Sequence, residues 1–108
     1  MALDVKYLYV VTMDVEPDKE DLFNEIYDNE HIPVLMKVPG VISAARYKTS
    51  DQGVARYLAI YELESPDVPH SEAFREASDS GEWPTKVRPF CKNRSRTVYT
   101  QILPPPKK

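Results

Sequence analysis

His31 is the side chain in this sequence best suited to moving a proton. It is one of two histidines among 108 residues and lies in the segment Tyr27-Asp28-Asn29-Glu30-His31-Ile32-Pro33. An imidazole has an ordinary pKa of about 6.5, so it can accept or donate a proton near neutral pH. Asp28 precedes it by three residues, a spacing that brings two side chains together on a helix surface. The pair could therefore act as an oriented general base on an enolisable or phenolic substrate.

The same residues also have a purely structural interpretation. Pro33 has no N–H and disturbs a helix around residues 30–32, so backbone groups there lose their usual partners. A packed His31 ring could satisfy those groups without taking part in any reaction. Asp28 could likewise be a solvated residue on the outer face of the helix. Both interpretations of His31 stay open from the residues alone.

Aromatic side chains form the second group of candidates, because their rings and hydroxyls can wall a cavity for an aromatic or polyketide-like ligand. The sequence has seven tyrosines and one tryptophan. Trp83 follows the second predicted helix and could close the cavity mouth or anchor its own loop. Arg46 and Arg88 could bind a substrate carboxylate or form surface salt bridges. The candidate ligand-binding residues are Tyr9, Tyr27, Tyr57, Tyr61, Trp83 and Arg46.

The helix that carries His31 is predicted from its apolar face, whose positions recur at steps of three and four. Pro17 suits the first turn, and the acidic residues that follow it lie near the positive end of the helix dipole. Pro33 predicts a kink near residues 30–32, and Val38-Pro39-Gly40 predicts the end of the helix. The apolar face consists of Leu22, Phe23, Ile26, Tyr27, His31, Leu35 and Val38.

A second helix and four β-strands complete the predicted elements. Runs rich in Val, Ile, Tyr and Leu predict the strands, and Ala73, Phe74 and Ala77 recur at helical spacing after the third run. The polar segment Ser50-Asp51-Gln52-Gly53 predicts a hairpin turn between the second and third strands. The strands are expected over residues 3–13, 41–49, 54–63 and 94–103, and the second helix over residues 69–80.

The resulting order, β-α-β-β-α-β, is the split βαβ arrangement of a ferredoxin-like fold. Its class is α+β, with two helices on one face of a four-stranded antiparallel sheet. The length favours one domain, which we assign to residues 1–103. Residues 104–108 contain only proline and lysine, and we expect them to form an extended C-terminal tail.

Both faces of the central predicted strands are apolar, which indicates an assembly. Tyr57, Ala59 and Tyr61 point to one face of the third strand, whereas Leu58 and Ile60 point to the other. Two helices can cover only one face of such a sheet, and the other would be an unusually large exposed apolar patch. A second copy packed around a twofold axis would cover it. We therefore predict a homodimer.

Composition and charge narrow the remaining classes of partner and cofactor. The 14 basic and 17 acidic residues give a net charge of −3 and are interspersed, so we expect neither nucleic-acid nor membrane binding. No apolar run approaches the length of a membrane span or a secretory signal, and Cys91 is the single cysteine, so a cytoplasmic location is expected. There is no glycine-rich phosphate loop and no histidine pair at metal-ligand spacing, so no cofactor and no metal is expected.

Several segments resemble the EthD-like proteins of the dimeric α/β-barrel superfamily. The resemblance runs from the first helix into the second strand and returns near the C-terminus, so it covers nearly the whole sequence. It implies a ferredoxin-like protomer that dimerises into an α/β barrel. The matching residues are Asn29-Glu30-His31-Ile32-Pro33, Leu35, Val38-Pro39-Gly40, Arg46-Tyr47, Arg88-Pro89-Phe90 and Arg96-Thr97-Val98-Tyr99.

The superfamily includes monooxygenases, isomerases, cyclases, decarboxylating dehydratases and haem enzymes, so membership selects no reaction. We expect a cofactor-independent lyase, isomerase or monooxygenase that acts on a hydrophobic or aromatic metabolite, with His31 and Asp28 as its catalytic residues. Haem held by a histidine is the one cofactor that the resemblance leaves open. The alternative is a non-catalytic ligand-binding or accessory protein of a degradation or biosynthesis pathway, in which His31 only hydrogen-bonds the ligand.

Overall fold

The fold of the chain is the α+β ferredoxin-like arrangement expected from the sequence. The computed structural model describes residues 5–105. Its strands are β1 (Tyr7–Val15), β2 (Val41–Lys48), β3 (Tyr57–Leu63) and β4 (Cys91–Thr100), and its α-helices are α1 (Glu20–Ile26), α2 (Ile32–Leu35) and α3 (Glu72–Ser78). Short 3-10 and π-helical turns are η1 (Pro17–Lys19), η2 (Tyr27–His31), η3 (Val68–His70), η4 (Trp83–Val87) and η5 (Arg88–Phe90).

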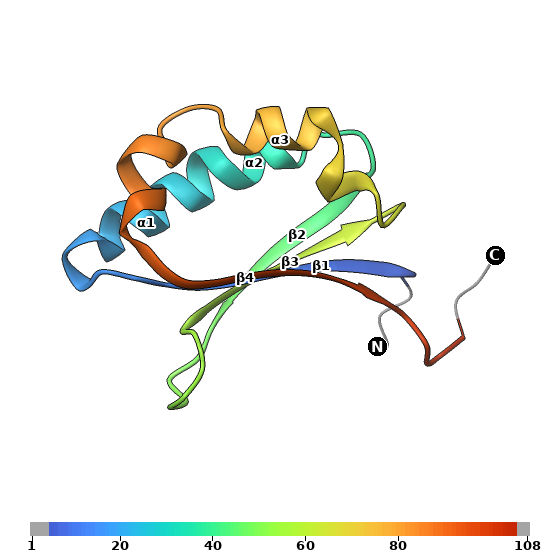
Figure 1. Ribbon diagram of the computed structural model, residues 1–108, viewed down its shortest axis with the longest axis horizontal. Coiled ribbons are helices and arrows are strands. Elements are labelled where there is room, and N and C mark those ends of the chain that lie inside the picture. The colour runs from blue at the N-terminus through green and yellow to red at the C-terminus, as the bar shows by residue number, and fades with distance from the viewer. Residues whose placement is uncertain (1–4, 106–108) are drawn as a thin grey trace.

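The four strands form one antiparallel sheet in the order β2-β3-β1-β4. Tyr9 in the centre of β1 lies opposite Tyr61 of β3 and Val98 of β4, which fixes the face on which each strand's residues lie. β2 and β3 pair as the predicted hairpin. Figure 1 shows α1, α2 and α3 together on one face of this sheet, while no described element covers the other face.

The helical segment after β1 contains a π-helical turn where a kink was expected. α1 runs into η2, which continues directly into α2, and the N–H of Ile32 bonds to the carbonyl of Tyr27, five residues back. Pro33 cannot donate to the carbonyl of residue 29, so the widened turn just before it accommodates the missing bond. The chain therefore changes its helical phase at His31 without breaking the helix.

Element boundaries differ from the predicted ones at several ends. β4 begins at Cys91, three residues before the predicted start, because residues 91 and 92 pair with the end of β1 beyond a bulge after Thr12. β1 extends to Val15 for the same reason. Residues 101–105 form neither helix nor strand, and the remainder of the predicted tail, like the first residues of the predicted first strand, lies outside the described residues.

The core lies between the helical layer and the inner face of the sheet. Alternate residues of the central strands are buried there, and the intervening residues on the outer face are half-buried. Phe23 and Leu35 from the helical segment and Phe74 from α3 pack onto this inner face. The inner-face strand residues are Tyr9, Val11, Met13, Tyr57, Ala59, Tyr61 and Leu63.

Gly40 allows the turn between α2 and β2, and its replacement should destabilise the protein more than a matched replacement elsewhere. Its φ is +94°, and a Cβ would lie 2.5 Å from Cγ2 of Val68. Gly53 in the hairpin has a similar φ of +85° but open space around it. Gly40→Ala should therefore combine backbone strain with a clash and cost about 2–4 kcal/mol, whereas Gly53→Ala should cost about 1–2 kcal/mol of strain alone. Urea unfolding of both variants tests this, and equal losses would contradict the packing at Gly40.

Candidate functional site

A cavity of about 310 Å³ lies between the helical layer and the inner face of the sheet. Its apolar wall comes from β1, α2 and α3, and includes Val11, Met13, Leu35 and Phe74. Five of the aromatic or imidazole side chains selected from the sequence also line it, namely Tyr9, Tyr27, His31, Tyr61 and Trp83. The structure therefore brings together one predicted catalytic residue and four predicted ligand-binding residues.

The rings of His31 and Trp83 are stacked at the wall of this cavity. Their centroids are 4.3 Å apart and their planes differ by 18°. The Tyr27 ring meets both edge-on, with centroids 5.3 Å from His31 and 4.9 Å from Trp83. His31 is 6% exposed and Trp83 2% exposed, so the stack is almost entirely removed from solvent. Trp83 thus has a defined partner in the site in addition to anchoring its own segment.

Both stacked rings are carried by π-helical turns, His31 at the end of η2 and Trp83 at the start of η4. A second contact fixes one turn against the other, since the Glu30 carboxylate accepts a hydrogen bond of 2.8 Å from the N–H of Glu82. Glu30 occupies the space that a side chain at Gly81 would need, and Gly81 has a φ of +68°. π-Helical turns are rare and occur often at functional sites. Because two of them meet at this cavity, the region is a candidate functional site.

Burial keeps His31 uncharged near neutral pH. The pKa of its imidazole is lowered from 6.5 to about 4, mainly by desolvation and then by the positive charges of Arg88 and Arg94. Among the described residues, no hydrogen bond joins either ring nitrogen to another group. The ring therefore does not satisfy backbone groups at Pro33, and it can offer a nitrogen to a molecule in the cavity.

The cavity tyrosines are also held in their neutral form. Burial raises the pKa of Tyr9, Tyr27 and Tyr61, most strongly that of Tyr61. The hydroxyls of Tyr27 and Tyr61 lie 3.5 Å apart, so the two groups share a weak hydrogen bond deep in the core. These residues offer neutral hydroxyls and ring faces to a ligand.

Arginines form the polar side of the cavity, and sequence reasoning had singled out only one of them. Arg88 was considered as a carboxylate ligand, whereas Arg94 and Arg96 were not. A signal was present, because Arg94, Arg96 and Val98 alternate along one strand and so lie on one face of it. The register confirms that face, since Arg96 lies opposite Val11 and Val98 opposite Tyr9 on the inner side of the sheet.

Three of the predicted site residues lie elsewhere. Asp28 pairs with Arg46 at 2.6 Å and its side chain is 57% exposed, so the expected pairing of Asp28 with His31 is not formed. The guanidinium of Arg46 lies over the Tyr27 ring, 4.4 Å from its centroid, and Arg46 does not line the cavity. The Tyr57 hydroxyl donates to the carboxylate of Glu20 and likewise does not reach the cavity.

The structure offers little to a metal ion. Within residues 5–105 no group of three or more His, Cys, Asp or Glu side chains is clustered, and His31 is the single imidazole in the cavity. Cys91 is half-buried, and burial raises the pKa of its thiol, so it remains protonated near neutral pH. None of the helices in the described range is long and apolar enough to cross a membrane.

Comparison with known proteins places the chain in a family. Residues 6–76 match a family described as a domain of unknown function, DUF4286. The chain belongs to this family. No curated protein shows significant similarity to the sequence.

Several solved structures have a fold similar to that of this chain. A candidate antibiotic biosynthesis monooxygenase from Bordetella bronchiseptica has 20% identity and a TM-score of 0.72, with 92% of this chain and 99% of that chain covered. An EthD family protein from Bacillus halodurans has 10% identity and a TM-score of 0.64, with 89% and 99% covered. SnoaB, a cofactor-independent oxygenase from Streptomyces nogalater, has 20% identity and a TM-score of 0.62, with 94% and 99% covered.

These structures confirm the predicted resemblance at the level of the fold. The DUF4286 chain described here has the fold of the EthD family protein and of the antibiotic biosynthesis monooxygenase. At identities of 20% or less the likeness carries the fold and not a reaction.

The lowered pKa of His31 should make the free energy of unfolding depend on pH. Between pH 6.5 and about 4 the unfolded chain binds a proton at this residue that the folded protein does not, so stability falls as the pH falls. The full shift corresponds to about 3 kcal/mol. The stability advantage of the wild type over His31→Gln should therefore shrink by about 3 kcal/mol from pH 7 to pH 4. Urea unfolding at several pH values measures this, with His70→Gln at an exposed histidine as control. A constant difference would contradict a buried neutral His31.

Proposed function

We propose that this protein is a cofactor-independent enzyme that acts on a small aromatic or hydrophobic molecule, with His31 as the group that moves a proton. The observation that carries this proposal is a buried, uncharged imidazole without a hydrogen-bond partner at the wall of an aromatic cavity. A cavity of about 310 Å³ lies at the lower end of the range for small-molecule sites. The reaction class is isomerisation, dehydration with decarboxylation, or oxygenation.

The geometry supports a simple sequence of proton movements. A neutral His31 accepts a proton from an acidic C–H or O–H of the bound substrate, leaving an enolate or phenolate beside an imidazolium. Because burial disfavours the imidazolium, the proton is held only while the substrate anion lies next to it. Return of the proton to a different carbon gives an isomer, and attack of the carbanion on dioxygen gives an oxygenated product. The description of SnoaB as a cofactor-independent oxygenase supports the second route.

A second candidate function follows because no carboxylate orients the His31 ring in the described structure. Asp28 pairs with Arg46, and among the described residues no carboxylate hydrogen-bonds to His31 to fix its tautomer. A histidine that only donates or accepts a hydrogen bond to a ligand needs no such partner. In that case the protein binds a metabolite or assists a neighbouring enzyme of a pathway. Both candidates use the same cavity and differ in whether His31 transfers a proton.

The role of His31 can be tested without knowing the natural substrate. Deuterium exchange into an enolisable aromatic ketone such as 2-tetralone, followed by NMR in D₂O, reports proton abstraction directly. His31→Gln should lower the exchange rate by about 10²–10⁴-fold, the usual contribution of a general base. His70→Gln replaces the other histidine, which is exposed, and should leave the rate unchanged.

Binding of the same ketone is measured in parallel. Trp83 is the single tryptophan and lies in the cavity, so its fluorescence reports occupancy. The enzyme proposal predicts that His31→Gln keeps binding within about threefold while exchange is lost. Exchange that survives in His31→Gln would overturn proton transfer by this residue. Equal loss of exchange and binding would favour the non-catalytic candidate.

The enzyme is further proposed to act in the cytoplasm as a homodimer, in which a second copy covers the outer face of the sheet. Leu8, Val10, Leu58 and Ile60 lie on this face and are half-buried in the isolated chain. Figure 1 shows that the helices leave it uncovered. Such a broad apolar face is self-complementary when two sheets pack around a twofold axis.

Light scattering during size-exclusion chromatography tests this assembly. The wild type should have about twice the mass of the 12.4-kDa chain. Ile60→Lys places a charge in the centre of the outer face and should shift the protein towards monomer. Met36→Lys, on the helical side, is the matched control and should remain dimeric. A monomeric wild type would contradict the proposal.

A further inference from the structure

The charge of the cavity is opposite to that of the whole chain. The chain carries a net charge of −3. The cavity, in contrast, is lined by four arginines, with Asp79 as the single acidic side chain in its wall. These arginines are Arg75, Arg88, Arg94 and Arg96. Three of them come from η5 and β4, which are consecutive in the chain, so the positive charge lies at one end of the cavity.

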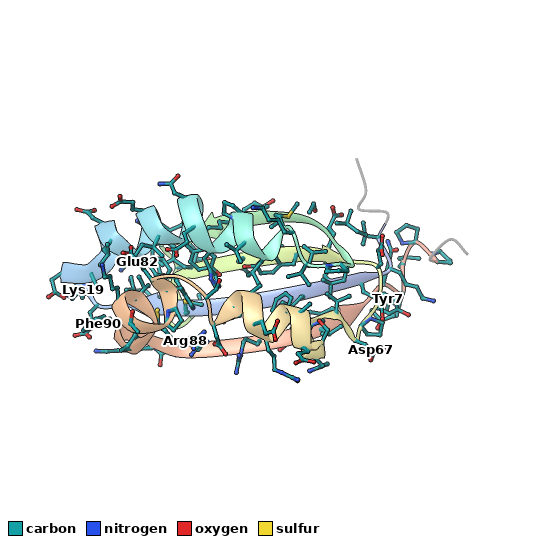
Figure 2. The ribbon with its side chains drawn as sticks, turned by 90° about the horizontal axis from the view of Figure 1, so that it is seen from above. Tyr7, Lys19, Asp67, Glu82, Arg88 and Phe90 are labelled. Atoms are coloured by element: carbon teal, nitrogen blue, oxygen red, sulfur yellow. The ribbon has the colours of Figure 1, made fainter. Side chains whose placement is uncertain are left out.

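Arg88 is fixed in place but not fully paired. Its Nη2 donates 3.0 Å to the carbonyl of Ser78 and 2.8 Å to the carboxylate of Asp79. Its Nε is buried and has no hydrogen-bond partner. A buried donor without an acceptor costs about 1–3 kcal/mol, so a ligand acceptor at this position would remove an existing penalty. Figure 2 shows Arg88 beside the turns that follow α3, on the side of the molecule where β4 runs.

Arg94 and Arg96 reach the cavity rim from the edge strand β4. None of the ion pairs among the described residues involves either of them. Arg88, Arg94 and Arg96 line the same cavity, and desolvation, followed by the charges of Arg96 and Arg88, lowers the pKa of Arg94. Arg96 also acts on Tyr9, whose hydroxyl faces the same end of the cavity. Crowded cations without acidic partners are the arrangement that an anion stabilises.

We propose that Arg88, Arg94 and Arg96 form a carboxylate-binding end of the cavity, and that its ligand is an aromatic or alicyclic carboxylate whose ring lies against Trp83 and Phe74. The planar guanidinium fork matches the two oxygens of a carboxylate, and the apolar wall accommodates the ring. His31 then lies between the two ends, next to the carbon atoms adjoining the carboxylate. This inference rests on the proposed function only in taking the same cavity as the ligand site.

The test compares two ligands of equal shape and different charge, 2-naphthoate and the neutral 2-naphthamide. Dissociation constants come from ligand-observed NMR titrations of the full chain. The wild type should bind the carboxylate at least about tenfold more tightly than the amide, the effect of one good charge-assisted contact. Arg94→Gln and Arg96→Gln should each remove most of this preference while leaving amide binding within about twofold.

Two further variants separate charge at the site from general effects. Arg56→Gln removes the same charge from an exposed position outside this cavity and should keep the full preference. Arg94→Lys keeps the charge without the planar fork and should show an intermediate preference for the carboxylate. This variant keeps the test informative if the glutamine variants do not fold. Equal affinity of the wild type for both ligands would overturn the carboxylate site but leave the cavity as a binding site. The same holds if the preference survives in the Arg94→Gln/Arg96→Gln double variant. Binding of neither ligand would overturn the carboxylate site and also count against the cavity as the active site.

Discussion

The stacking of His31 on Trp83 is the contact on which the site depends. The two rings come from segments more than fifty residues apart, and each lies on a π-helical turn. The stack closes the helical layer over the sheet and removes the imidazole from water. Tyr27 contacts both stacked rings edge-on, and the burial of His31 is the main cause of its lowered pKa. The hydrogen bond between Glu30 and the backbone of Glu82 holds the two turns in register.

The fold could be predicted from the sequence because the patterns that indicate helices, strands and turns are periodic and local. Steps of three and four residues placed His31 on the buried face of the first helix, and the polar turn at residues 50–53 predicted the β2–β3 hairpin. The partner of His31 was beyond this reasoning, because residue spacing assumes a regular α-helix. The widened turn η2 contains both Asp28 and His31 and changes the angle between residues three apart. Arg46 on β2 then provides the carboxylate with a partner from a different element.

The arginines at one end of the cavity could not be assigned to a site from the sequence alone. A strand with basic residues at alternate positions is as consistent with a solvated edge as with a ligand site, and only the register of β4 on β1 distinguishes the two. That register places Arg96 across from Val11, on the face of the sheet that carries the cavity. The proposed site combines a neutral imidazole with fixed positive charge. Such a pairing favours removal of a proton from a substrate, because the negative charge that develops lies beside groups that already carry the opposite sign.

The position of β4 has one more consequence, for the behaviour of the protein in concentrated solution. β4 is an outer strand of the sheet, so one row of its backbone N–H and C=O groups can pair with a foreign strand. Lysine, asparagine and two arginines occur among the first six residues of this strand, and bulky charged side chains at such an edge are a common protection against aggregation. The arginines proposed to bind a carboxylate therefore also hinder the addition of a strand from another molecule to the edge of the sheet. Apolar residues at positions 94 and 96, as a neutral ligand would require, would leave the edge of β4 free to pair with strands of other molecules. The choice of ligand and the solubility of the protein are therefore linked.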